Sequence, residues 1–236
     1  MASMSDGFAA TPIPEFFRDR RHAGRVLASL LRGHAGRPDL LVLALPRGGV
    51  PVAFEVAEAL RAPLDVFIVR KLGVPGHEEY AMGAIGPGGV RVLSDEVVRM
   101  LRIPESAIES VTRAELRELE RREHLYRGDL PPHDVRGRVV ILVDDGLATG
   151  STMLAAVRAL ARMQPARTIV AVPTGAPDTC QALRSEADEV VCAMTPENFR
   201  AVGLWYDDFS QTGDDEVRDL LQRAREDLEA RHVSHG

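Results

Sequence analysis

Short runs of apolar residues alternate with stretches of helical periodicity, and this alternation limits the fold more than any other feature of the sequence. The runs are nearly continuous Val, Ile and Leu, which is typical of parallel strands buried on both faces. The expected strands are 40–45, 64–69, 138–143, 168–172 and 189–194, and the expected helices between them are 50–60, 151–163 and 177–187. The pattern predicts an α/β fold: a doubly wound, mostly parallel sheet with helices on both faces.

The remaining segments complete a single predicted domain over 8–236, because no linker or repeat interrupts the chain. Amphipathic helices are expected at Pro104–Arg127 and at Asp214–Ala230, where apolar residues recur at helical spacing among many charges. Between the two halves, glycines and polar residues in 71–89 are too frequent for a regular element, so this segment is interpreted as a mobile loop.

Composition excludes several classes of protein. A net charge of -6 provides no basic surface for nucleic acid, and no apolar run approaches the ~18 residues of a membrane span. The beginning of the chain lacks the pattern of a secretion signal, so a cytoplasmic protein is expected. The two cysteines, Cys180 and Cys192, lack CxxC spacing and are expected to be buried apolar residues rather than a zinc site or a disulfide.

The segment VVILVDDGLATGST, residues 139–152, carries the strongest functional signal. Asp144 and Asp145 directly follow an expected strand, at the edge of a parallel sheet where ligands bind. The small and hydroxyl residues after them lead into a helix whose first amides can surround a phosphate. Two carboxylates would repel a bare phosphate, so the ligand should also offer hydroxyl groups or a metal ion, as a ribose 5-phosphate does.

Three alternatives compete with a phosphate site. A nucleoside triphosphatase loop is excluded because no lysine follows Gly150. A receiver domain is excluded because the next strand ends in Val172, Pro173 and Thr174 rather than in a phosphoacceptor aspartate. The third alternative, that Asp144 and Asp145 only cap the helix, stays open.

The segment closely resembles the motif by which type I phosphoribosyltransferases bind phosphoribosyl pyrophosphate (PRPP). The resemblance implies a parallel sheet with a small hood, and a glycosyltransferase that uses PRPP and Mg²⁺ to transfer ribose 5-phosphate to a nitrogen nucleophile. By position, Asp144 and Asp145 would hold the ribose hydroxyls. The implied PRPP-binding turn comprises Gly146, Ala148, Thr149, Gly150, Ser151 and Thr152.

A second segment, LALPRGGVPVA at 43–53, is similar to the pyrophosphate loop of the family. The resemblance implies a cis peptide between Pro46 and Arg47. Arg47 can form charge-assisted bonds to pyrophosphate, and Gly48 and Gly49 let the backbone approach it. An ordinary turn with a surface arginine is the alternative.

Residues 70–89 occupy the place of the family's flexible catalytic loop. Arg70 and Lys71 are candidates for pyrophosphate contact. The residues that could close over the reaction are His77, Glu78, Glu79 and Tyr80. Glu78 or Glu79 is the candidate proton acceptor, although each of these residues could equally be a solvated side chain.

The segment PENFRAVGLWYDDF, 196–209, resembles the hood of hypoxanthine-type enzymes and places the hood within 195–212. Phe199 would stack on the base, with Trp205 and Asp207 beside it. The alternative is a small aromatic core under the C-terminal helix. Mg²⁺ would be held mainly through PRPP, with Asp145 and Asp207 as candidate ligands.

Two departures leave the acceptor open. Ala148 replaces an aspartate of the 6-oxopurine enzymes, and 171–177 contains no lysine, whereas the LATGST turn looks more like that of adenine enzymes. We expect a salvage transferase that acts on a nucleobase or similar nitrogen heterocycle and releases pyrophosphate, because Arg47 and the loop at 70–89 would serve the leaving group. A PRPP-sensing module without turnover and a phosphoribosyl-dependent step of specialised metabolism stay open as alternatives. The expected partners are PRPP and a nucleobase-like molecule, without nucleic acid or membrane. The family is commonly dimeric, but the sequence leaves open whether this chain forms a homodimer.

Overall fold

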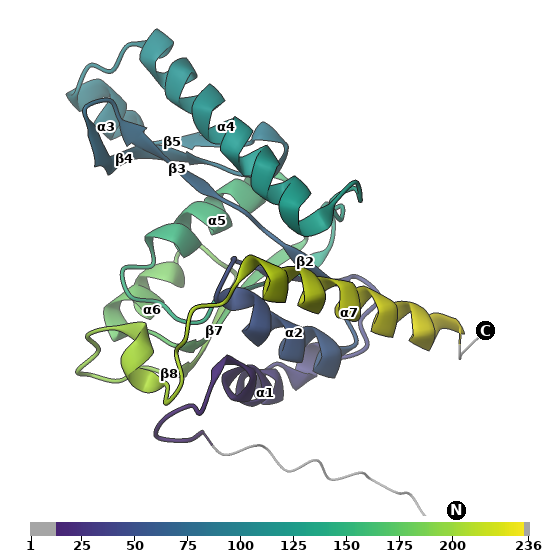
Figure 1. Cartoon of the computed structure of the whole chain (residues 1–236). Helices are drawn as coiled ribbons and strands as arrows, with labels where there is room; N and C mark the ends of the chain where they lie inside the picture. The colour runs from purple at the N-terminus through teal and green to yellow at the C-terminus, as the bar shows by residue number, and fades with distance from the viewer. Residues whose placement is uncertain (1–12, 234–236) are drawn as a thin grey trace, which may run out of the picture.

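The computed structural model describes residues 13–233, so residues 8–12 and 234–236 of the predicted domain lie outside the described part (Figure 1). A five-stranded parallel sheet forms its centre, in the order β2-β1-β6-β7-β8. Its strands are β1 (Leu40–Ala44), β2 (Leu64–Val66), β6 (Val139–Val143), β7 (Arg167–Thr174) and β8 (Glu189–Met194). All five follow from the apolar runs of the sequence.

Helices cover both faces of this sheet (Figure 1). On one face lie α1 (Arg20–Leu30), α2 (Gly49–Leu60) and α7 (Asp214–Val233), and on the other lie α5 (Ser151–Arg162) and α6 (Pro177–Leu183). Alternate residues of β1 enter the two cores: Leu40 and Val42 face α2, whereas Leu41 and Leu43 face α5. The predicted α/β fold is therefore confirmed.

A second, antiparallel sheet projects from the first together with α3 (Asp95–Met100) and α4 (Glu105–Arg127) (Figure 1). Its strands are β3 (Arg70–Val74), β4 (His77–Ile85) and β5 (Arg91–Leu93). The three short 3₁₀ helices of the described chain are η1 (Arg32–His34), η2 (Pro87–Gly89) and η3 (Val202–Trp205).

The expectation that 71–89 lacks regular structure is wrong, and its glycines explain why. A Cβ at Gly73 would lie 2.7 Å from the carbonyl oxygen of Glu78, and one at Gly83 would lie 2.3 Å from that of Val92. These glycines therefore mark places where two strands approach closely, not places where the chain leaves a sheet.

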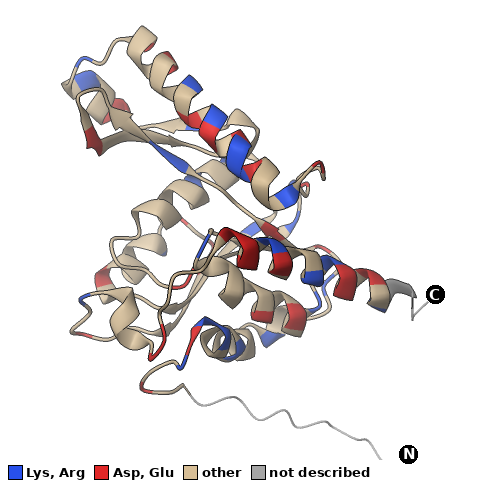
Figure 2. Ribbon diagram, in the orientation of Figure 1, with Lys and Arg blue, Asp and Glu red and all other residues tan. Residues whose placement is uncertain are grey.

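The long helix α4 matches the predicted helix closely and carries both signs of charge along its exposed side (Figure 2). Its buried side includes Ile108 and Leu119, which join the core that β3 and β4 share with α2. At its end, buried Arg127 pairs with Asp65 at 3.1 Å and anchors the second sheet's helix to β2.

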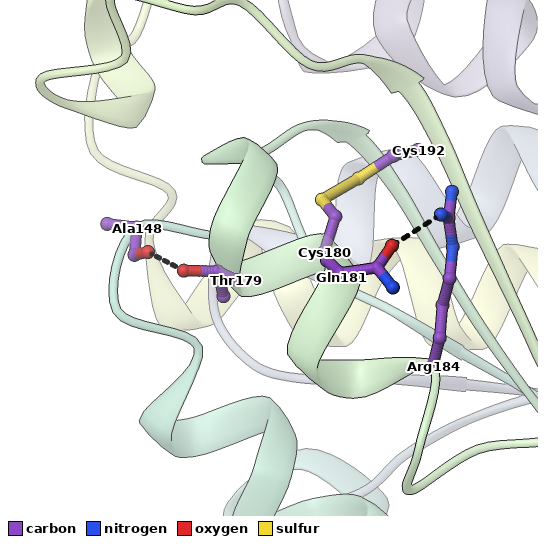
Figure 3. The surroundings of a disulfide bond; sticks show 6 residues. All are labelled: Ala148, Thr179, Cys180, Gln181, Arg184 and Cys192. Carbon is purple, nitrogen blue, oxygen red and sulfur yellow. Dashed lines mark hydrogen bonds between the residues drawn. A yellow bond between two sulfur atoms is a disulfide. The ribbon is translucent and has the colours of Figure 1, made fainter.

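Cys180 of α6 and Cys192 of β8 form a disulfide (Figure 3). Cys180 is buried as expected, but the expectation of two unpaired thiols is wrong, because α6 packs on β8 and brings the sulfurs together. Disulfides persist mainly in oxidising compartments, so a cytoplasmic location stays a prediction. Within residues 13–233, no helix has both the length and the apolar character needed to cross a bilayer.

Candidate functional site

The strand order reverses between β1 and β6, which makes the space beyond their carboxyl ends the expected ligand site. β1 connects through α2 to β2 on one side, whereas β6 connects through α5 to β7 on the other. Ala44 and Val143, the last residues of these two strands, are paired. Ligands of open α/β sheets bind at such a switch point, so the turns at 45–49 and 144–150 form the candidate site.

The two turns touch each other through glycines. A Cβ at Gly48 would lie 2.0 Å from Oδ2 of Asp145, and one at Gly49 would lie 2.7 Å from the carbonyl oxygen of Val143. Side chains at these positions would force the turns apart. The peptide bond between Pro46 and Arg47 is cis, as the resemblance implied.

Gly48→Ala is expected to weaken PRPP binding by about tenfold or more, because an added methyl in a filled site costs ~1 to 3 kcal/mol. Calorimetric titration would measure the change. The matched control is Gly33→Ala, since nothing lies within 4 Å of a Cβ at that position. Binding by Gly48→Ala equal to that of the control would contradict the contact between the turns.

Asp144 and Asp145 form a crowded, partly buried acid pair. The backbone N–H of Asp145 donates to Oδ1 of Asp144 at 2.9 Å. Burial, followed by the neighbouring charge of Asp145, raises the pKa of Asp144 well above its ordinary value. Burial also raises the pKa of Asp145, although the guanidinium of Arg20 opposes this rise. The pair is therefore costly to ionise without a cation or hydroxyl donors.

Asp144→Asn is expected to stabilise the ligand-free protein increasingly as pH rises. The pKa of Asp144 is higher in the folded protein than in the unfolded chain. The contribution of its protonated carboxyl to folding stability is therefore fully present below the ordinary pKa of 3.8 and is lost as pH rises through the folded-state pKa. Asparagine does not ionise, so the variant keeps this contribution. Urea unfolding at several pH values between 4 and 8 would test it; a difference that does not grow with pH would contradict the account.

The turn after the acid pair leads into the first residues of α5. Gly150 has φ 68°, the left-handed conformation that favours glycine, and the residues around it are exposed. From α6, the Thr179 hydroxyl donates to the carbonyl oxygen of Ala148 at 2.7 Å (Figure 3). The Thr149 and Ser151 hydroxyls lie 3.1 Å apart. Backbone amides and hydroxyls thus converge where an anion can bind.

The antiparallel sheet brings other predicted residues beside this turn. A cleft of about 340 Å³ between that sheet and α5 is lined by Lys71, Glu79 and Ser151 among others. Arg70 alternates to the opposite face and donates to Glu115 of α4 at 2.7 Å. Glu78 is exposed and does not line the cleft. His77 and Tyr80 are also exposed.

The predicted hood segment packs against the acid pair. The Tyr206 hydroxyl donates to the carbonyl oxygen of Asp145 at 2.6 Å, and a Cβ at Gly146 would lie 2.5 Å from Cγ1 of Val202. Trp205 stacks on Phe16, with ring centroids 5.7 Å apart.

Three of the four aromatic residues of the hood segment belong to one small core: Tyr206 is a member, and Trp205 and Phe209 pack against it. Phe17 and Tyr206 join a small core with Ala23 and Val26 of α1, so the aromatic core lies against the N-terminal helix rather than under the C-terminal one. Phe199 is half-buried outside this core, and Asp207 is exposed. Their base-binding roles stay predictions.

The comparisons with known proteins agree with this geometry. The family model described as a phosphoribosyl transferase domain matches residues 18–208, which include both turns, the antiparallel sheet and most of the hood segment. The chain belongs to the phosphoribosyltransferase family. The resemblance drawn from the sequence is therefore confirmed.

Relatives of this chain include two proteins of Mycobacterium tuberculosis, from strains CDC 1551 and H37Rv, that are provisionally named phosphoribosyl transferases. Each is 48% identical over 214 residues, which are 91% of this chain and 48% of the relative. The chain thus spans about half the length of these relatives. The crystal structure of TT1426 from Thermus thermophilus has a TM-score of 0.80 and 43% identity, covering 88% of this chain and 98% of that one.

Three side chains that contact the predicted site were not predicted from the sequence. Arg20 donates to Asp145 at 2.8 Å, and Tyr206 holds the backbone of the same residue. Asp214 lies 3.8 Å from a guanidinium nitrogen of Arg47 and accepts a bond of 2.6 Å from Tyr126. Arg20 and Asp214 belong to no predicted motif and reach the site from distant parts of the chain. Tyr206 lies in the predicted hood segment, but the sequence does not show that it contacts the acid pair.

Proposed function

We propose that this phosphoribosyltransferase uses PRPP with Mg²⁺ and transfers ribose 5-phosphate to a nitrogen of a nucleobase-like heterocycle, with release of pyrophosphate. One observation carries the proposal: the predicted pyrophosphate loop is in direct contact with the acid pair, through Gly48 and Asp145. The phosphate turn follows the acid pair in the chain. Groups suited to the three parts of PRPP therefore lie around one switch point.

Each part of PRPP has a matching set of groups. The carboxylates of Asp144 and Asp145 accept hydrogen bonds from the ribose hydroxyls. The amides and hydroxyls of 148–152, at the start of α5, surround the 5-phosphate. Arg47, whose side chain is 38% exposed, can turn its guanidinium to the pyrophosphate.

The acid pair also fits the demands of Mg²⁺. This ion is usually held by one or two carboxylates together with substrate phosphates, and the pair supplies two carboxylates beside the predicted phosphate sites. When bound, Mg²⁺ would neutralise charge on the pyrophosphate. Asp145 and exposed Asp207 are the candidate protein ligands.

The transfer breaks the bond between the anomeric carbon and pyrophosphate and forms a bond from that carbon to the acceptor nitrogen. Arg47 and Lys71 stabilise the negative charge of the departing pyrophosphate. Glu79, which lines the cleft beside Lys71, takes the proton that the acceptor nitrogen loses. Closure of the β3–β4 hairpin over the cleft would exclude water from the oxocarbenium-like transition state.

The test is a panel of purine, pyrimidine and other nitrogen heterocycles, each incubated with PRPP and Mg²⁺ and monitored for pyrophosphate. The proposal predicts release that depends on one class of acceptor and is lost in Asp144→Asn, Asp145→Asn. Tight binding of PRPP without release for any acceptor would instead support the PRPP-sensing function. Neither binding nor release would contradict both.

A further inference from the structure

Arg20, the first residue of α1, is fixed by three contacts that converge from different parts of the chain. Its Nε donates to Oδ2 of Asp145 at 2.8 Å, and its Nη1 donates to the carbonyl oxygen of Ser210 at 2.6 Å. The centre of the guanidinium lies 3.9 Å from the centroid of the Phe209 ring. With its side chain only 12% exposed, Arg20 is an interior part of the site rather than a surface charge.

The start of α1 fixes the position from which this arginine reaches. The side chain of Asp19 caps the helix by accepting a bond from the backbone N–H of His22 at 2.7 Å. Phe17 is fully buried, and its backbone pairs with the hood segment around Tyr206. Arg20 therefore projects from a backbone that is held on both sides.

Asp145 is restrained from three directions. Arg20 bonds its Oδ2. The backbone of Gly48 lies so close to the same oxygen that a Cβ at Gly48 would be 2.0 Å from it. Tyr206 holds its carbonyl oxygen at 2.6 Å. Because Arg20 bonds Oδ2 and the backbone of Gly48 approaches it closely, Oδ1 is the better placed of the two oxygens to accept from a ligand hydroxyl.

We infer that Arg20 is a positioning residue, which orients the Asp145 carboxylate toward the hydroxyls of a ribose 5-phosphate and joins the hood segment to the ribose site. The inference rests on the proposed function, since it concerns how the acid pair recognises the sugar. It assigns to Arg20 no contact with phosphate. Its effect should therefore depend on the ribose hydroxyls of the ligand.

Arg20→Ala is expected to weaken binding of ribose 5-phosphate by about tenfold, the effect of losing one charge-assisted bond that orients a binding group. Inorganic phosphate, which lacks the sugar, should bind within about twofold of wild type. Arg20→Lys keeps the charge but not the planar fork that reaches both Asp145 and Ser210, so it should restore binding only in part. Calorimetry with each ligand at constant Mg²⁺ measures these differences.

The matched control is Arg21→Ala. Arg21 is the next residue of the same helix, lies 3.6 Å from Glu55 and also faces an aromatic ring, that of Phe54 at 5.7 Å. The Arg21→Ala variant therefore loses an ion pair and a ring contact of the same kind, but outside the site. Its affinity for ribose 5-phosphate should equal that of the wild-type protein.

A double-mutant cycle separates positioning from a general structural effect. In a protein that already carries Asp145→Asn, Arg20→Ala should cause little further loss, because both changes disable the same interaction. Additive losses would overturn the inference, as would an equal loss of phosphate binding. Unchanged or tighter binding of ribose 5-phosphate by Arg20→Ala would overturn it too. The ion pair between Arg20 and Asp145 would then have no effect on sugar binding or would compete with the sugar.

Three further outcomes are distinguishable. If Arg20→Ala does not fold, Arg20→Lys carries the test, and wild-type affinity for ribose 5-phosphate in that variant would overturn the inference. If wild-type protein binds neither PRPP nor ribose 5-phosphate, the proposed function fails and the inference fails with it. Wild-type binding that Arg20→Ala leaves intact removes the inference alone.

Discussion

PRPP with Mg²⁺ is expected to raise the melting temperature of the wild-type protein, and replacing Asp144 and Asp145 together by asparagine is expected to abolish this rise. A ligand at 100 times its dissociation constant adds ~2.7 kcal/mol to the stability of the native state. The variant loses the acceptors for the ribose hydroxyls and the carboxylates that suit Mg²⁺. The variant should still fold, because the substitutions replace two partly buried carboxylates, which are costly to ionise, by neutral side chains. Thermal unfolding with and without ligand measures the effect.

An exposed acid provides the control for the loss of charge. Asp129, with a fully exposed side chain in the connection before β6, can be changed to asparagine without touching the acid pair. PRPP should stabilise this control variant by the same amount as the wild-type protein. Equal stabilisation of the acid-pair variant would show that these carboxylates do not hold the ribose.

Arg47→Ala is expected to lower the rate of pyrophosphate release by ~100-fold or more, because removal of one preorganised donor at a developing negative charge costs about that much. Ribose 5-phosphate lacks the pyrophosphate group, so its binding should change far less. The two assays, release from PRPP and binding of the sugar phosphate, separate a leaving-group role from a general one.

Arg121→Ala is the matched control for Arg47, since Arg121 is an exposed arginine of α4 that bonds Glu118 at 2.8 Å. It should retain the wild-type rate. Equal losses in both assays for Arg47→Ala would indicate misfolding or a general binding role, and an unchanged release rate would exclude Arg47 from the leaving-group site.

The parallel sheet could be predicted because its strands are buried on both faces. Burial on both sides requires an unbroken apolar run, and the run at 189–194 has the same bounds as β8. The helix predicted to end at Arg127 does end there, where Gly128 follows with a φ of 61°. Local composition was sufficient in both cases.

The antiparallel sheet could not be predicted in the same way. Gly73 and Gly83 lie where strands approach closely, yet in a sequence a glycine indicates a turn as readily as a close contact. The helix α1 was also missed, although Asp19 provides a capping signal and Ala23, Val26 and Leu27 have helical spacing. The disulfide depends on how α6 packs on β8, which two isolated cysteines do not reveal.

In the candidate site, too, local features could be predicted and contacts between distant segments could not. The two turns could be predicted because each is a continuous motif at the end of a strand. Arg20 could not, since 125 residues separate it from Asp145. The predicted contact of Arg70 with pyrophosphate could not be read from the sequence either, because its pairing with Glu115 of α4 at 2.7 Å depends on how α4 packs on β3.

The central claim is that the acid pair, the phosphate turn and the pyrophosphate loop form one PRPP site, and calorimetric titration of the wild-type protein with PRPP and Mg²⁺ tests it most directly. We predict saturable binding of one PRPP per chain, weakened in Gly48→Ala and absent when Asp144 and Asp145 are both asparagine. Absence of binding to the wild-type protein, or binding that the asparagine pair leaves unchanged, would contradict the claim.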